Sequence, residues 1–389
     1  MPIDAAVQQA IDAFAPDAEE ISNVGGRAHL VKLRSNGDWL RVRRWPEEAP
    51  RQRVAFVASV RSALAEANVV TAPRPVPAIN GGALFIERAG RWFEAQEWRE
   101  GRAGARKTPP LDLHEHAVHA PANLPGDALP QLAAALAETH LTTASLITPS
   151  APAAPLRSVL AAVSRQWRDD HALLRRQALQ QTILQRWIRA TEQAMPEIEN
   201  ALTAVDFLSQ SEPVIARFNV WPAHLLFTRA EGKERLATLL DPSASAVSSP
   251  LLDIAQAITH GSGWTTAAAE IGLAAYADAR RLSPDERRLL PAVAALDLVA
   301  ETGRLLRIAY SGGRDADWEM ADFARDGANS ALVSLETILP AIRRATESGP
   351  LFKARPWIRR PRPDAKPGEK STPGRSQTER RRTNDRRSD

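Results

Sequence analysis

The 389-residue chain contains no cysteine, which excludes disulfides, a thiol nucleophile and any metal or iron–sulfur site with Cys ligands. No apolar run approaches the ~18 residues that a membrane-spanning helix needs. The first residues, MPIDAAVQQAIDAFAP, lack the basic segment followed by an apolar one that marks a secretory signal. With 44% hydrophobic and 25% charged residues, the composition is typical of a folded globular protein. We expect a cytoplasmic protein without a membrane partner.

Positive charge is concentrated at the end of the chain. Residues 351–389 hold 13 Lys and Arg against 5 Asp and Glu, whereas the rest of the chain holds 37 against 41. Because the tail has few apolar residues to bury, we expect it to be disordered and to bind polyanions weakly. The slightly acidic body is not typical of a nucleic-acid-binding domain.

The first hundred residues predict a small lobe of mixed structure. Apolar spacing predicts a helix over residues 3–14, and alternation predicts a β-hairpin over residues 21–46. The hairpin turn is expected at Asn36-Gly37, with both residues at positive φ. A helix over residues 50–68 would present an apolar face. That face consists of Val54, Val57, Val60 and Leu64. Two more short strands are expected, with turns at Asn80-Gly81-Gly82 and Ala89-Gly90.

Beyond residue 129 the pattern is mainly helical, after a polar stretch over residues 102–127 that predicts a loop. PVIARF (213–218) is expected to pair as a strand with HLLFT (224–228), followed by RLATLLDPS (235–243). Helices are predicted over residues 129–143, 156–178, 180–206, 251–260, 264–281, 284–311 and 318–345. The sequence therefore predicts an α+β protein with a small lobe (1–98), a helical lobe (99–350) and a basic tail (351–389).

Two segments combine polar residues in a pattern that carries information about function. One is ARFNVWPAHLLF (216–227), and the other is LLDP (239–242) followed by PLLDIA (250–255). Asp241 and Asp253 are twelve residues apart. In order and spacing these segments resemble the aminoglycoside phosphotransferase and choline kinase group, in which a loop H-G-D-x-x-x-x-N precedes an I-D-F/W and, about twelve residues on, a D-L-A.

Four further segments resemble the same group, so the resemblance spans roughly residues 20–340. They are GGRAHLVKL (25–33), LRVRRWP (40–46), RWFEAQEWREG (91–101) and LAETH (136–140). The resemblance implies a two-lobed protein-kinase-like fold that uses ATP with Mg²⁺ and a small-molecule hydroxyl acceptor. It also implies that Gly25 and Gly26 belong to a hairpin covering the nucleotide, and that Arg43 takes the place of the strand lysine.

The departures from the family pattern bear directly on catalysis. The resemblance places Asn219 at the catalytic Asp, His224 at the metal-binding Asn and Arg217 at the loop His, and it leaves Asp241 as the second metal ligand. Asn219 does not ionise and so does not accept a proton, a loss that costs ~10²–10⁴ in rate. His224 offers nitrogen, whereas Mg²⁺ prefers oxygen ligands.

The leading hypothesis is thus a phosphotransferase-family protein, a pseudokinase, whose ATP-dependent transfer to a small molecule is weakened or lost. Two alternatives remain open at this point. One is an active ATP-dependent small-molecule kinase, and the other is a non-enzymatic interaction protein that uses the old cleft or the basic tail. His114-Glu115-His116 with His119 resembles a metal cluster, but the polar, Pro-flanked stretch favours a solvated loop.

The tail generates a first testable prediction. Deleting residues 353–389 should leave the melting temperature nearly unchanged, because a segment so poor in apolar residues contributes little burial to the body. Differential scanning calorimetry of the full-length and truncated proteins checks this. A large drop in melting temperature would mean that the tail packs on the body.

Overall fold

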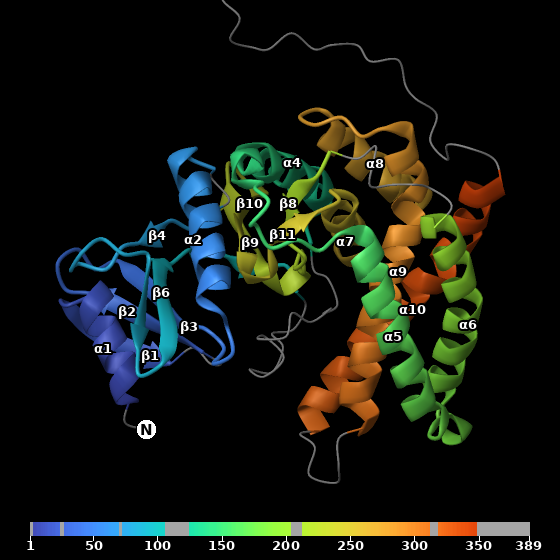
Figure 1. Ribbon diagram of the computed structural model, residues 1–389, viewed down its shortest axis with the longest axis horizontal. Coiled ribbons are helices and arrows are strands. Elements are labelled where there is room, and N and C mark those ends of the chain that lie inside the picture. Colours follow the sequence, from blue (N-terminus) through green and yellow to red (C-terminus); the bar gives the residue numbers. More distant parts are fainter. Residues whose placement is uncertain are drawn as a thin grey trace, which may run out of the picture. The chain divides into compact units, whose positions relative to one another are not determined.

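A computed structural model of the protein describes six stretches of the chain (Figure 1). They are residues 3–23, 27–69, 72–105, 124–203, 212–311 and 318–347. Several predicted features lie outside these residues, namely Gly25 and Gly26, the histidines of the 114–119 segment and the basic tail. The contacts between residues divide the chain into two units, residues 1–352 and residues 353–389.

The small lobe is built on an antiparallel sheet with the strand order β1-β2-β3-β6-β4. Strand β5 pairs with residues 91–94 of β6, next to the residues that pair with β4. The strands are β1 (Ala18–Asn23), β2 (Ala28–Leu33), β3 (Trp39–Arg44), β4 (Pro75–Val76), β5 (Phe85–Arg88) and β6 (Arg91–Glu97). The predicted hairpin is confirmed as β2 and β3, with Lys32 paired to Trp39. The prediction missed β1, which adds a further strand to the hairpin.

Two tight turns of this sheet differ in their chemistry. Between β5 and β6, Ala89 and Gly90 both have positive φ (47° and 71°), which is the pair that a type I′ hairpin turn requires. Between β2 and β3 only Gly37 does (φ 76°). Expecting positive φ at Asn36 as well was wrong. The Asn36 side chain instead accepts a hydrogen bond from the Asp38 backbone N–H at 3.0 Å, closing the turn locally.

A helix covers each face of the small sheet (Figure 1). Along β3, Leu40 and Val42 are buried against α1 (Ala5–Phe14), as the period-two alternation of a strand dictates. The opposite face meets α2 (Arg51–Glu66), whose Val54 and Val57 pack against Trp45. Arg41 and Arg43 share this second face by the alternation of the strand, whereas Arg44 lies near Asp4, which caps α1.

Short strands connect the two lobes, and one predicted pairing is corrected. These strands are β7 (Arg102–Ala103), β8 (Val214–Ala216), β9 (Leu225–Ala230), β10 (Lys233–Leu239) and β11 (Ala246–Ser248). PVIARF does not pair with HLLFT: β8 pairs with β11, and β9 pairs with β10 and β7. The loop between β8 and β9 is thereby framed by two different sheets.

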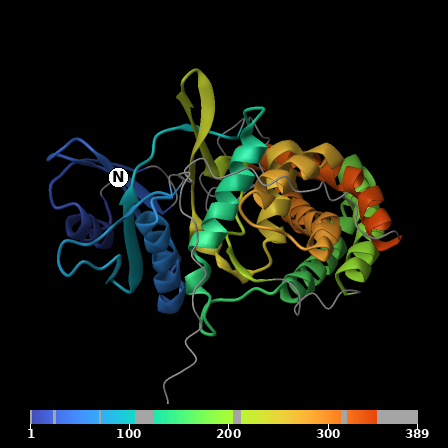
Figure 2. The same cartoon turned by 90° about the horizontal axis from the view of Figure 1, so that it is seen from above.

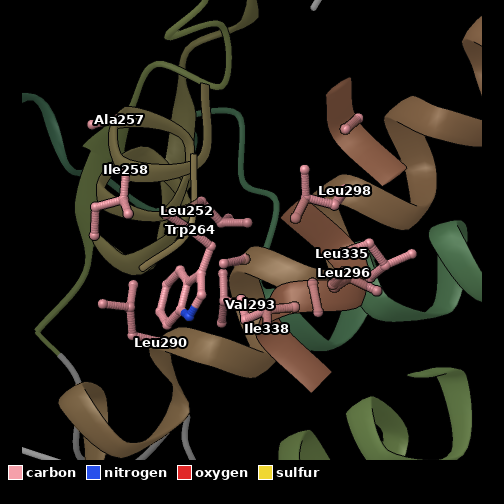
Figure 3. Packing of buried hydrophobic residues seen from close by; sticks show 14 of the residues in the cluster. Leu252, Ala257, Ile258, Trp264, Leu290, Val293, Leu296, Leu298, Leu335 and Ile338 are labelled. Carbon is pink, nitrogen blue, oxygen red and sulfur yellow. The ribbon is translucent and has the colours of Figure 1, made fainter. Parts of the chain in front are cut away.

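The large lobe is helical, as predicted, and its long helices pack side by side (Figure 2). The helices are α4 (Ala128–Thr142), α5 (Leu156–Arg175), α6 (Thr182–Thr203), α7 (Leu251–Ser262), α8 (Thr266–Ala277), α9 (Pro284–Ser311) and α10 (Trp318–Glu347). Their core is apolar, with Trp264 lying among Leu252, Leu290 and Val293 (Figure 3). Among the described helices, none is long and apolar enough to cross a membrane.

Candidate active site

The loop between β8 and β9 is held by one buried carboxylate. Asp253, in the first turn of α7, is fully buried. It accepts hydrogen bonds from the backbone N–H of Arg217 (3.0 and 2.7 Å) and of Phe218 (3.0 Å). On its other side, His140 Nε2 of α4 lies 2.9 Å from Asp253 Oδ2, and His140 Nδ1 lies 2.7 Å from the Tyr276 hydroxyl. Three helices therefore fix the start of the loop.

Phe218 lies in the left-handed region with φ 63°, which a non-glycine residue adopts at a cost of about 1–2 kcal/mol. Its N–H donates to Asp253 and its side chain packs against the helical core. These contacts offset the strain and hold the backbone where the family pattern has a glycine.

Asn219 and His224 lie together and are buried, with 4% and 7% of their surface exposed. His224 Nδ1 lies 3.1 Å from the Asn219 backbone oxygen. The Asn219 side-chain Oδ1 is buried and has no hydrogen-bond partner among the described residues. Burial lowers the pKa of His224, against the opposing effect of Asp241. The imidazole is therefore neutral at pH 7.

Arg217 joins this loop to the segment that carries Asp241. Its guanidinium donates to the backbone oxygens of Leu239 (3.0 Å) and Leu240 (2.8 Å). Burial lowers the pKa of Arg217 to about 10, although Asp253 and Asp241 favour its charged form. Arg217 therefore ties the β8–β9 loop to the segment that precedes Asp241.

Asp241 is held by an arginine from the small lobe. Its Oδ1 lies 2.6 Å from Arg43 Nη1 and also accepts a hydrogen bond from the Ser243 N–H at 3.1 Å. Burial alone would raise the pKa of the Asp241 carboxyl, but Arg43 and then His224 hold it well below its usual range. Arg53 of α2 donates to the backbone oxygens of Ser243 and Ser245, so a second arginine joins the small lobe to this segment.

These residues do not fit a Mg²⁺ ion. The Asp241 oxygen nearest the small lobe is taken by a guanidinium, and the other predicted ligand, His224, is a neutral imidazole engaged with a backbone oxygen. Mg²⁺ requires near-octahedral oxygen ligation. Across the described stretches of the chain, no group of three or more His, Cys, Asp or Glu side chains is placed to hold a metal ion.

A cavity of about 840 Å³ lies elsewhere, between α2, β5 and the short 3₁₀ helix η1 (Ala144–Leu146). Its lining includes Ser59, Phe85 and Ser145. None of the predicted site residues lines it.

The structure brings the predicted residues into two adjacent groups. Arg43 meets Asp241, and Asn219 meets His224. Asp253 and His140 belong to motifs that the sequence shows, but nothing in the sequence indicates that their side chains contact each other. It also missed Arg53, because an arginine at a helix N-terminus carries no pattern that points to a distant backbone.

The sheet lobe, the helical lobe and the anchored loop between them define a two-lobed, protein-kinase-like fold. A family model for the phosphotransferase enzyme family matches residues 20–292, which is more than half of the chain. The protein belongs to this family. No curated protein matches the chain.

Solved structures agree on the fold. An aminoglycoside phosphotransferase from Alicyclobacillus acidocaldarius is 16% identical, with a TM-score of 0.60, covering 89% of this chain and 97% of that one. The spectinomycin phosphotransferase APH(9)-Ia, in complex with ADP and spectinomycin, is 11% identical, with a TM-score of 0.53 and coverage of 89% and 99%. Amicoumacin kinase hAmiN, in complex with AMP-PNP, Ca²⁺ and Ami, is 11% identical, with a TM-score of 0.53 and coverage of 83% and 92%.

Replacing the anchor should destabilise the fold. In Asp253→Asn one carboxylate oxygen becomes an NH₂ donor, so the contacts made by Oδ2 with the Arg217 N–H and His140 and the negative charge are lost, at a cost of about 2–4 kcal/mol. Urea unfolding should show this loss, and hydrogen exchange should quicken at residues 217–219. The control Asp278→Asn, on an exposed residue after α8, should change stability little. Equal stability of the two variants would refute the role of Asp253.

Removing the charge of Asp241 should destabilise the protein and change its acid response. Asp241→Asn leaves Arg43 without its ion-pair partner, at a cost of about 2–4 kcal/mol, below that of a fully buried pair. Because the folded pKa is lowered, this stabilisation is present above the unfolded-state value near 3.8 and is lost as pH falls below it.

Urea unfolding at pH 7, 5 and 3 measures both effects. The gap between wild type and Asp241→Asn should shrink toward pH 3. Asp322→Asn, which removes an exposed pair with Arg325, should cost less than about 1 kcal/mol. A gap that stays constant with pH would mean that the Asp241 charge does not stabilise the fold.

Proposed function

We propose that the protein is a phosphotransferase-family member with an ATP-type nucleotide and a small-molecule hydroxyl acceptor as ligands, whose phosphoryl transfer is weakened or lost. The family model supports the class, and the nucleotide complexes of the similar structures support the ligand type. The observation that carries the loss is the pairing of Arg43 with Asp241 beside a loop that offers Asn219 in place of a carboxylate.

Transfer of a phosphoryl group depends on positioning, on neutralising the phosphate charge and on a group that orients the acceptor hydroxyl. Asn219 has the shape of an aspartate but not its charge. Its Oδ1 can accept a hydrogen bond from the acceptor hydroxyl but cannot take up the proton. Among the described carboxylates beside the loop, Asp253 is committed to two backbone N–H groups and His140, and Asp241 is paired with Arg43. The acceptor would therefore be held without being deprotonated.

The neutralising charge is also changed. Arg43 forms an ion pair with Asp241. The guanidinium is therefore less available to neutralise a phosphate than a lysine beside a metal-bound aspartate would be. Losing both contributions at one step explains why we expect transfer close to background.

The test combines reversions. The unmodified protein, assayed with ATP and Mg²⁺ against aminoglycosides, choline and water as acceptors, should transfer phosphate barely above background. Asn219→Asp with His224→Asn and Arg43→Lys restores a proton acceptor, an oxygen ligand and a flexible cation. This variant should gain ATP hydrolysis or transfer of up to about 10²-fold, and its nucleotide binding should become more dependent on Mg²⁺.

Adding Asp241→Ala to the triple variant should abolish that gain, whereas adding the exposed Asp278→Asn should not. Thermal shift with ATP, with and without Mg²⁺, reports nucleotide binding separately from turnover. Robust Mg²⁺-dependent transfer by the unmodified protein would overturn the proposal and favour an active kinase. Absence of any nucleotide shift would favour an interaction protein.

A further inference from the structure

Strand β5 is an edge of the small sheet, because among the described strands it pairs only with β6. The register places Arg88 opposite Arg91 across the two-residue turn. Hydrogen-bonded and non-hydrogen-bonded pairs alternate along an antiparallel ladder. The backbone groups of Ile86 and Arg88 therefore face β6, and those of Phe85 and Glu87 face outward. The Glu87 carbonyl agrees with this, since it accepts a hydrogen bond from the Arg88 side chain at 2.7 Å.

The outward backbone groups of this strand are available for pairing. Within the part of the chain that the structure describes, no backbone hydrogen bond engages the N–H or C=O of Phe85 or the N–H of Glu87. Such an edge is a template for a further strand. When an extended peptide adds to an edge, its main chain supplies affinity and its alternate side chains supply specificity.

A cavity lies beside the edge and has room for the side chains of an added strand. Three of the four residues of β5 line the cavity of about 840 Å³. One wall is a face of α2 with the small side chains of Ala55, Ser59 and Ser62. Phe85 and Trp92 also line it, and their rings make an edge-to-face contact at 5.6 Å. The cavity therefore offers aromatic surface opposite a helix face that leaves space.

The charge of the cavity favours a cationic side chain. Glu87 is exposed and stands directly opposite Trp92 in the β5–β6 register, where side chains of a pair lie close together. No described residue forms a hydrogen bond or ion pair with the Glu87 carboxylate. A carboxylate beside an indole suits Lys or Arg, through an ion pair and a cation–π contact. The ionisable lining residues are Arg51, Glu66 and Glu87, one cation against two carboxylates.

We propose that the outer edge of β5 and this cavity bind an extended segment of a partner protein, which adds antiparallel to β5. The residues of the segment that pair with Phe85 and Glu87 direct their side chains to the α2 face, because side chains of a strand alternate. The segment places a Lys or Arg opposite Glu87, where Trp92 lies, and an apolar residue two positions away opposite Phe85. Neither Arg43 nor Asp241 lines the cavity, so this site is separate from the candidate active site.

Fluorescence anisotropy on the full-length protein tests the site with a heptapeptide of sequence TVTKTVT, which carries a neutral dye at its N-terminus and a C-terminal amide. As a strand, this peptide presents Val, Lys and Val on one face and Thr on the other. It should bind saturably, and amide hydrogen exchange should slow in residues 84–88. The peptide TVTETVT should bind more weakly, because it places like charges opposite each other.

Methylation of the peptide backbone separates strand addition from other modes of binding. N-methyl groups on Val and Lys remove the donors that would face β5, so they should abolish binding. N-methyl groups on the Thr residues, whose amides face away from β5, should leave binding nearly unchanged.

Variants of the protein test the two walls of the cavity. Ser59→Trp fills the space from α2 and should prevent binding. Gln52→Trp is the matched control, because Gln52 is an exposed residue of the same helix that does not line the cavity. Glu87→Gln should weaken binding of TVTKTVT about two- to fivefold, as for the loss of an exposed ion pair. Circular dichroism checks folding, and if Ser59→Trp does not fold, Glu87→Gln and the methylated peptides decide.

Four outcomes would overturn the inference. The first is no saturable binding of TVTKTVT up to about 1 mM. The second is equal binding of the two methylated peptides, and the third is a folded Ser59→Trp variant that binds like the wild type. The fourth is a dimer in sedimentation velocity that Ser59→Trp dissociates and Gln52→Trp does not, because the occupant of the β5 edge would then be a second copy of this chain.

Discussion

The arrangement of the site depends on the buried carboxylate of Asp253. A buried charge without compensation is costly, yet here it receives backbone N–H groups from Arg217 and Phe218 and an imidazole nitrogen from His140. The same carboxylate therefore fixes the loop, sets the left-handed backbone of Phe218 and joins α4 to α7. Asn219 follows this anchor directly, whereas His224 is held in addition by the Leu240 N–H, which donates to its backbone oxygen at 2.8 Å.

The second constraint is the distribution of charge where the lobes meet. Asp241 is neutralised by Arg43, and Glu94 on β6 is neutralised by Arg61. Arginine suits such partly buried pairs because it stays charged and forms directional hydrogen bonds. The Arg43–Asp241 pair joins the small lobe to the helical lobe, whereas the Arg61–Glu94 pair fastens α2 to β6 within the small lobe.

Features that depend on local pattern could be predicted from the sequence. The helical face of α2, with Val54 and Leu64, was read from its spacing, and Ala89-Gly90 from its turn chemistry. Interactions between distant segments could not. The sequence did not predict that strand 214–216 pairs with strand 246–248, because short apolar strands carry no information about their partner. At the site, the order of motifs gave the positions of Asn219 and Asp241, whereas the ion pair of Arg43 joins residues 198 apart and has no signature in sequence.

The residues of the site form two sets that differ in what their side chains contact. Asp253, His140 and Tyr276 hold the loop from behind and contact one another. Asn219, His224 and Arg43 make their own contacts, His224 with the Asn219 backbone oxygen and Arg43 with Asp241. Since the anchor does not depend on those three side chains for its hydrogen bonds, altering them leaves the loop in position. Arg43→Lys still alters the ion pair with Asp241, so urea unfolding of the reverted protein must accompany the activity measurement to separate a change in proton acceptance and charge from a loss of stability.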